Sequence, residues 1–178
     1  MFILYAIPIG LLGGWLAGGR LERLSSVPFA WAWLAMAGLL VQVVLFSGLV
    51  EDLDDGLGAA VYVASTAAVL VAVVRNVRLA GMPLVMAGAA ANLLAIVANG
   101  GVMPTTVDAL RAAGLDPTDG FSNSAVVADP AVAPLTDVFA LPPWVPLANV
   151  FSVGDVLIAI GVALVIALGM RAPEPPRD

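Results

Sequence analysis

The chain of 178 residues is 61% hydrophobic and 11% charged, whereas an ordinary soluble domain carries about 25% charged residues. It contains no cysteine and no histidine, which excludes disulfides, thiolate or imidazole metal sites and histidine-based triads, so we expect neither a metal nor a cofactor. A net charge of −6 without any lysine leaves no basic patch for nucleic acid. The composition therefore predicts an integral membrane protein surrounded by the lipid bilayer.

Five apolar runs follow one another along the chain, and each approaches the roughly 20 residues that a transmembrane helix needs. They cover residues 2–18, 29–50, 57–74, 80–98 and 151–170. We therefore expect an all-α fold, a single integral membrane domain over residues 1–178 with five transmembrane helices in a polytopic bundle. Arginines follow the first run instead of preceding it, the reverse of a signal peptide, so we interpret this run as a retained span.

The arginines orient this predicted bundle. Six of the seven basic residues lie in the segments 19–28, 75–79 and 171–178. Because basic residues stay on the cytoplasmic side of a membrane, we expect an outer N-terminus, an inner C-terminus and a multi-pass protein of the bacterial cytoplasmic (inner) membrane. The first outer loop is acidic, with Glu51, Asp52, Asp54 and Asp55.

The longest connection, residues 99–150, is predicted to lie on the outer face. Thr105 and Asp108 have the spacing of a capping box, and Gly114 follows as a stop signal, so we expect a short helix between them. The stretch 141–146 contains too many prolines for a helix, but it is apolar enough to lie on the membrane surface.

Small residues form two packing faces. Gly10, Gly14 and Gly18 are four residues apart in the first run, and Gly88 lies on a similar face of the fourth. Such spacing lets another helix approach closely in lipid. The first face packs either within the chain, against the second or fourth span, or against another membrane protein, which would then be a partner.

Polar residues inside the apolar runs must find hydrogen-bond partners. Asn92 and Asn99 share one face of the fourth run, with Gln42 and Ser65 or Thr66 as candidate partners. Either these residues are structural links between helices, or they line a polar pocket that opens outward. That pocket would be formed by Asn92, Asn99, Asn149 and Gln42.

Asp155 is the single acid inside a predicted span, a few residues from its start. Ionisable groups in spans are costly and often functional. Ser152 and Asp155 also have S-x-x-D spacing, so the carboxylate could instead cap the helix. The sequence leaves both interpretations open.

Three motifs resemble a bacterial membrane-protein family catalogued as a domain of unknown function. They are Gly19-Arg-Leu-Glu-Arg23, Asn99-Gly-Gly-Val-Met-Pro104 and Asn149-Val-Phe-Ser-Val-Gly-Asp155. The resemblance extends over nearly the whole chain and implies no activity.

The C-terminal part is similar to lipoprotein signal peptidase, a membrane aspartyl protease. The similarity rests on Thr136-Asp-Val-Phe139, on Pro142-Pro-Trp144 and on the stretch from Asn149 to Asp155. It implies that Asp155 matches one catalytic aspartate, while the G-N-x-x-D-R motif of the second has no counterpart. Because aspartyl catalysis needs two close carboxylates that share a proton, Asp137 would have to supply the second by folding back over Asp155.

Three functions are therefore compared. The first is an accessory or scaffold protein without catalytic machinery, which the scarcity of ionisable residues favours. The second is an outward-facing aspartyl hydrolase that uses Asp155 with Asp137. The third is a carrier for a small solute or lipid, although no span is broken in the way that carriers require.

Overall fold

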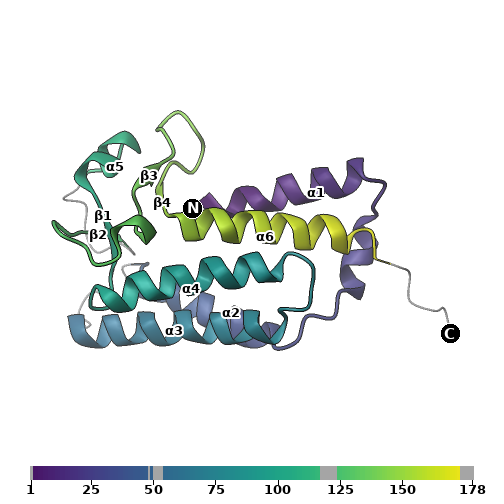
Figure 1. Cartoon of the computed structure of the whole chain (residues 1–178), viewed down its shortest axis with the longest axis horizontal. Coiled ribbons are helices and arrows are strands. Elements are labelled where there is room, and N and C mark those ends of the chain that lie inside the picture. The colour runs from purple at the N-terminus through teal and green to yellow at the C-terminus, as the bar shows by residue number, and fades with distance from the viewer. Residues whose placement is uncertain (1, 48, 50–53, 117–123, 173–178) are drawn as a thin grey trace.

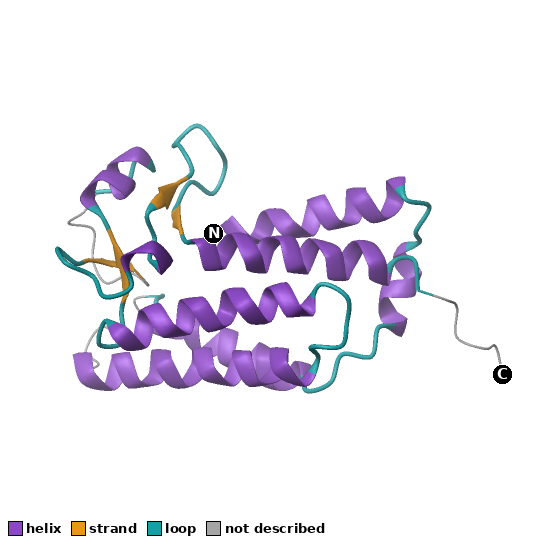
Figure 2. Ribbon diagram, in the orientation of Figure 1, coloured by secondary structure: helices purple, strands orange, loops and turns teal. Residues whose placement is uncertain are grey.

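The computed structural model describes residues 2–47, 49, 54–116 and 124–172. The long helices lie side by side, and the strands gather beyond one end of them (Figures 1 and 2). We call this end, with strands β1–β4 and helix α5, the sheet end. The opposite end is called the arginine end, because it carries Arg20, Arg75, Arg78 and Arg171.

The helices and short strands alternate along the chain. The helices are η1 (Phe2–Tyr5), α1 (Ala6–Leu16), η2 (Leu21–Ser26), α2 (Ala32–Leu45), α3 (Asp55–Arg75), α4 (Met82–Ala98), α5 (Val107–Ala112), η3 (Ala133–Leu135) and α6 (Val153–Gly169). The strands are β1 (Met103–Thr105), β2 (Ser124–Val126), β3 (Phe139–Ala140) and β4 (Val150–Phe151). β1 pairs in parallel with β2, and β3 pairs antiparallel with β4.

The predicted all-α bundle of five transmembrane helices, with its outer N-terminus and inner C-terminus, is wrong. Among the described residues, one helical stretch of 20 residues, Gly56–Arg75 of α3, is long and apolar enough to cross a membrane, with a mean hydropathy of 2.2 over an 18-residue window. The other apolar helices have 10–17 residues. The fold also includes two small sheets at the sheet end.

The prediction of five spans failed because the hydropathy of a segment does not show at which residues helical hydrogen bonding begins and ends. The run 29–50 contains only the 14 residues of α2, since Trp31 takes a left-handed conformation (φ 58°) before the helix. At 1.5 Å per residue such a helix is about 21 Å long, shorter than the hydrocarbon core of about 30 Å. In the first run α1 ends at Leu16, and Gly18 adopts φ +77°.

The predicted outer loop 99–150 is more structured than expected. A short helix does form there, but its cap is Thr106, whose hydroxyl accepts a hydrogen bond from the Ala109 amide at 3.1 Å. The predicted cap, Thr105, belongs to β1 instead and is 1% exposed. Of the acidic residues in the predicted first outer loop, Glu51 and Asp52 lie outside the described residues.

Helix α6 packs between α1 and α4 (Figure 1). A Cβ atom on Gly10 would lie 2.8 Å from the Ala163 carbonyl oxygen, and one on Gly14 would lie 3.1 Å from the Ala167 Cα. The glycine face therefore packs within the chain on α6, and not on the second or fourth predicted span. Gly18 lies beyond α1, and a Cβ there would meet nothing within 4 Å.

Candidate functional site

Asp155 lies in the first turn of α6, where both of its carboxylate oxygens accept hydrogen bonds. Oδ2 accepts from the Ser152 amide at 3.1 Å, and the Ser152 hydroxyl accepts from the Asp155 amide at 3.0 Å, which completes a capping box. Oδ1 accepts from Asn92 Nδ2 at 2.7 Å. The Ser152 hydroxyl donates to Asn92 Oδ1 at 2.9 Å, so the three side chains form a closed ring that ties α6 to α4.

Two glycines make room for this ring. A Cβ on Gly154 would collide with Asn92 Oδ1 and lie 2.8 Å from the Gly88 carbonyl oxygen. A Cβ on Gly88 would lie 2.8 Å from the Ile158 side chain. The close crossing of α4 and α6 therefore depends on the absence of side chains at both positions, and Ser152 becomes completely buried in it.

Asp137 lies in the chain segment beside β1. Its backbone amide donates to the Pro104 carbonyl at 2.9 Å, and the Thr105 hydroxyl donates to the Asp137 carbonyl at 2.8 Å. The side chain is 4% exposed, and its Oδ2 accepts from the Ser124 hydroxyl at 2.6 Å. Oδ1 is buried and has no hydrogen-bond partner among the residues that the structure describes.

The surroundings of Asp137 disfavour its ionised form. Burial raises the pKa of the Asp137 carboxyl to about 7, the hydrogen bond from Ser124 opposes this increase, and the charge of Asp155 adds to it. Near neutral pH the side chain therefore exists in both protonation states.

The structure brings Asp137 and Asp155 near each other without joining them. The pairing of Phe139 with Phe151 places the two segments side by side, and the charge of Asp155 acts on Asp137. In the described part of the chain no hydrogen bond links the two carboxyl groups. The hydrogen bonds that the Asp155 carboxylate accepts come from Asn92 and Ser152. A pair that shares one proton needs direct contact.

The four residues of the predicted polar pocket have separate partners. Gln42 donates to Thr66 at 3.2 Å between α2 and α3, whereas Asn92 bonds to α6. The side-chain oxygen of Asn149 accepts from the adjacent Val150 amide at 2.9 Å. The predicted pairing of Asn92 with Gln42, Ser65 or Thr66 is therefore wrong, since its partners are Ser152 and Asp155.

Asn99 is the C-cap of α4 and holds a distant loop. Its Nδ2 donates to the carbonyls of Ala95 at 2.7 Å and Ala131 at 3.0 Å, and its Oδ1 accepts from the Ala131 amide at 2.8 Å. The side chain therefore clamps the loop of the sheet end onto the last turn of α4.

Sequence reasoning missed Asn76, which makes the same three bonds at the arginine end. It is the C-cap of α3, its Nδ2 donates to the carbonyls of Ala72 and Ala30 at 2.7 Å each, and its Oδ1 accepts from the Ala30 amide at 2.8 Å. An asparagine directly after the last apolar turn was the available signal, since asparagine is favoured where a helix ends.

A groove of about 570 Å³ runs between α1 and α6. Its lining side chains are apolar apart from the Tyr5 hydroxyl, which donates to the Pro146 carbonyl. The lining residues are Phe2, Tyr5, Ala6, Ile9, Gly10, Gly13, Leu141, Val145, Val156, Ala159, Ile160, Ala163, Leu164 and Ala167.

The comparisons with known proteins find one match. A model described as "Family of unknown function (DUF5317)" matches residues 26–167. The chain belongs to this family. The resemblance to a domain of unknown function is thus confirmed, and the matched region includes the motifs at 99–104 and 149–155. No curated protein and no solved structure matches the chain, so the similarity to lipoprotein signal peptidase has no support.

Proposed function

We propose that this member of the DUF5317 family is a multi-pass protein of the bacterial cytoplasmic membrane that serves as an accessory or scaffold protein. The 20-residue apolar stretch Gly56–Arg75 supports a membrane location. Helices α4 and α6 have 17 residues each, the lower limit for a span, and a thinned bilayer accommodates such helices at modest cost.

The outward surface of the helices supports the same location. Four large apolar side chains on α1 and α2 are each more than 65% exposed, namely Trp15, Leu16, Trp33 and Met36. Other large apolar side chains on these helices are exposed to a lesser degree. Soluble proteins rarely leave contiguous apolar patches of this kind in water. Trp31 and Trp33 lie at the arginine end, and Arg75 lies over the Trp31 ring at 5.9 Å, an arrangement typical of membrane interfaces.

The role of a scaffold rests on one observation, that both oxygens of Asp155 accept structural hydrogen bonds, Oδ1 from Asn92 of α4 and Oδ2 from the Ser152 amide that caps α6. A carboxylate held in this way performs a structural task, since each of its oxygens already accepts a hydrogen bond from a residue other than Asp137. The sheet end would then be a rigid platform, with its loops clamped by Asn99, on which a partner protein binds.

One observation favours the aspartyl hydrolase as a second candidate. Asp137 is buried, has an oxygen without a partner among the described residues, and lies within electrostatic reach of Asp155. A protonated Asp137 beside an ionised Asp155 has the charge state of an aspartyl pair. This function requires Asp155 to exchange Asn92 or Ser152 for contact with Asp137 when a substrate binds.

Three aspartate-to-asparagine variants, expressed in a strain that lacks the gene, distinguish the two functions. We expect Asp137→Asn and Asp155→Asn each to stay in the membrane fraction after an alkaline wash and to complement the deletion, because asparagine still accepts hydrogen bonds. Asp108→Asn is the control, since Asp108 is exposed in α5. Stable membrane-bound Asp137→Asn and Asp155→Asn proteins that both fail to complement, beside a working control, would establish the hydrolase.

A further inference from the structure

We propose that the groove between α1 and α6 binds one phospholipid with an anionic headgroup, its acyl chain in the groove and its phosphate at the arginine end. This inference rests on the proposed membrane location. It names a ligand that the accessory or scaffold function does not require.

The dimensions of the groove suit a hydrocarbon chain better than a helix. From Val156 to Ala167 the lining of α6 rises by eleven residues, or about 16 Å at 1.5 Å per residue. A volume of about 570 Å³ over that length corresponds to a mean cross-section of about 35 Å². A helix about 10 Å across has roughly twice that cross-section, so a hydrocarbon chain fills the groove more closely than a second copy or a partner helix would.

The chemistry of the lining selects an apolar occupant. The one side chain with a polar group, Tyr5, already donates its hydroxyl proton to the Pro146 carbonyl. A peptide or a polar solute would lose its hydrogen bonds to water without replacement, whereas a hydrocarbon chain has none to lose.

We place the headgroup at the arginine end of the groove. At the sheet end the lining includes the apolar side chains of Leu141 and Val145 from the proline-rich loop, and Phe2 stacks on Phe151 at 4.3 Å between ring centroids. At the other end the lining stops at Gly13 and Ala167, close to the ends of α1 and α6.

Two arginines follow the lining residues at the arginine end. Arg171 comes four residues after Ala167, just beyond the end of α6, and it is exposed. The Arg20 amide donates to the Met170 carbonyl at 2.8 Å, which brings the two chain segments together. Two guanidinium groups at the arginine end are complementary to the phosphate of a lipid whose chain lies in the groove.

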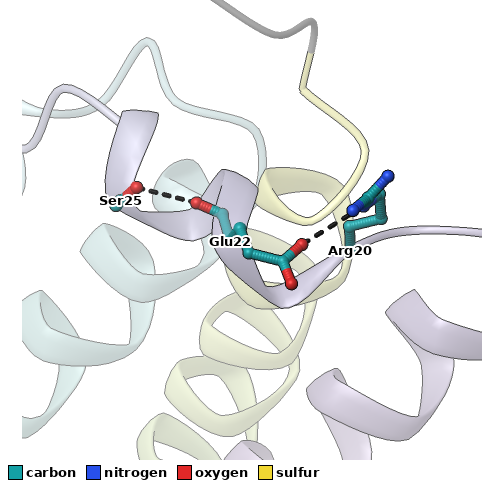
Figure 3. A network of polar contacts seen from close by, with 3 residues as sticks. All are labelled: Arg20, Glu22 and Ser25. Atoms are coloured by element: carbon teal, nitrogen blue, oxygen red, sulfur yellow. Dashed lines mark hydrogen bonds and ion pairs between the residues drawn. The ribbon is translucent and has the colours of Figure 1, made fainter.

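Arg20 keeps donors for such a phosphate. Its salt bridge to Glu22 uses Nε, at 3.2 Å, and the side chains are 63% and 77% exposed (Figure 3). An ion pair this exposed contributes little and exchanges readily for another anion. The Ser25 hydroxyl donates to the backbone carbonyl of Glu22 and not to its side-chain carboxylate (Figure 3). Ser25 therefore does not strengthen the hold of this carboxylate on Arg20, for which a phosphate would compete.

Lipid binding is tested with the full chain, purified in mild detergent, stripped of lipid and examined by native mass spectrometry. Phosphatidylglycerol is compared with phosphatidylcholine of the same acyl chains. We expect the anionic lipid to bind more tightly to the wild-type protein. The Gly13→Leu side chain would occupy the groove, because a Cβ there meets only the Ala167 Cβ at 4.0 Å. This variant should bind both lipids about tenfold more weakly, which is the effect of displacing two methylene groups of the acyl chain.

Matched variants separate the tail from the headgroup. Ala90→Leu places the same leucine side chain at an exposed position of α4 outside the groove, and this variant should bind both lipids normally. Arg20→Gln with Arg171→Gln should remove the preference for phosphatidylglycerol, whereas Arg78→Gln, at the same end on the α3–α4 turn, should retain it. The double arginine variant leaves the helix packing untouched and tests the proposal even if Gly13→Leu does not fold.

Three results would overturn the proposal: wild-type affinity in Gly13→Leu, equal affinity of the wild-type protein for the two lipids, or a preference for phosphatidylglycerol that the double arginine variant retains. Any of these results with a protein that stays in the membrane after an alkaline wash rejects the lipid site alone. A protein released by that wash rejects the membrane location itself.

Discussion

The Asp137 carboxyl is 4% exposed and accepts a hydrogen bond from Ser124 alone among the described residues. Burial raises its pKa from 3.8 to about 7, so the folded protein binds a proton there more tightly than the unfolded chain does. The stabilising effect of this proton is fully present below about pH 4 and is lost as the pH rises through about 7. Asp137 thus makes the stability of the sheet end depend on pH near neutrality.

Substitution of Asp137 by asparagine should remove this dependence. The amide oxygen can still accept from Ser124, and no charge is buried. We expect the thermal midpoint in detergent to fall between pH 4 and pH 7 for the wild-type protein and to vary less for Asp137→Asn, which becomes the more stable of the two at pH 8. The exposed Asp108→Asn is the control. Parallel midpoint curves for Asp137→Asn and wild type would contradict the assigned burial effect.

At the scale of elements, the contact between α1 and α6 depends on which glycine faces the neighbouring backbone. Gly10 faces it directly, since a Cβ there would lie 2.8 Å from the Ala163 carbonyl oxygen. Gly13 lies one turn further on toward the groove, where a Cβ meets only the Ala167 Cβ at 4.0 Å. Close packing therefore leaves no room for a side chain at Gly10, whereas a small side chain fits at Gly13.

Alanine at these two positions should have effects of opposite sign. Gly13→Ala should raise the thermal midpoint, because alanine is favoured over glycine in a helix by about 1 kcal/mol. Gly10→Ala gains the same propensity but forces α1 away from α6, so its midpoint should fall below that of the wild-type protein. The measurement is thermal unfolding of both variants in one detergent. A midpoint increase in both would mean that α1 and α6 are not in close contact.

At the scale of the whole molecule, two asparagine clamps hold the loops at opposite ends of the helices. Asn76 fixes Ala30 at the arginine end, and Asn99 fixes Ala131 at the sheet end, each through two hydrogen bonds of its side chain, while a third bonds to the last turn of its own helix. Both side chains join the end of one helix to a loop more than 30 residues away, so the clamps stabilise tertiary and not local structure.

Each clamp should act only at its own end. Asn99→Ala removes the acceptor of the Ala131 amide and should speed its hydrogen exchange without changing that of Ala30, whereas Asn76→Ala should do the reverse. Exchange followed by mass spectrometry measures both segments in one experiment, so each variant is the control for the other. Faster exchange at both ends in either variant would indicate global destabilisation and contradict two independent clamps.

The features that sequence reasoning predicted correctly depend on near neighbours in the chain. A helix does occur within each of the five apolar runs, and the Ser152–Asp155 spacing does produce a capping box. Helical periodicity and capping involve residues three or four apart, so a single segment contains all the information they need. The error over the five spans arose because apolar residues such as Trp31 and Phe46 lie outside α2 although they belong to its run.

The amino-acid sequence by itself determined that this protein is apolar, where its helices lie and how α6 is capped. Only the tertiary structure decided that Asn92 is the partner of Asp155, 63 residues away, that the glycines of α1 face α6, and that Asp137 is buried beside β1. These pairings could not be read from the chain because several helices offer equally apolar faces with small residues. Close packing in three dimensions selects among these faces, since it alone brings polar groups within hydrogen-bonding distance where water is excluded.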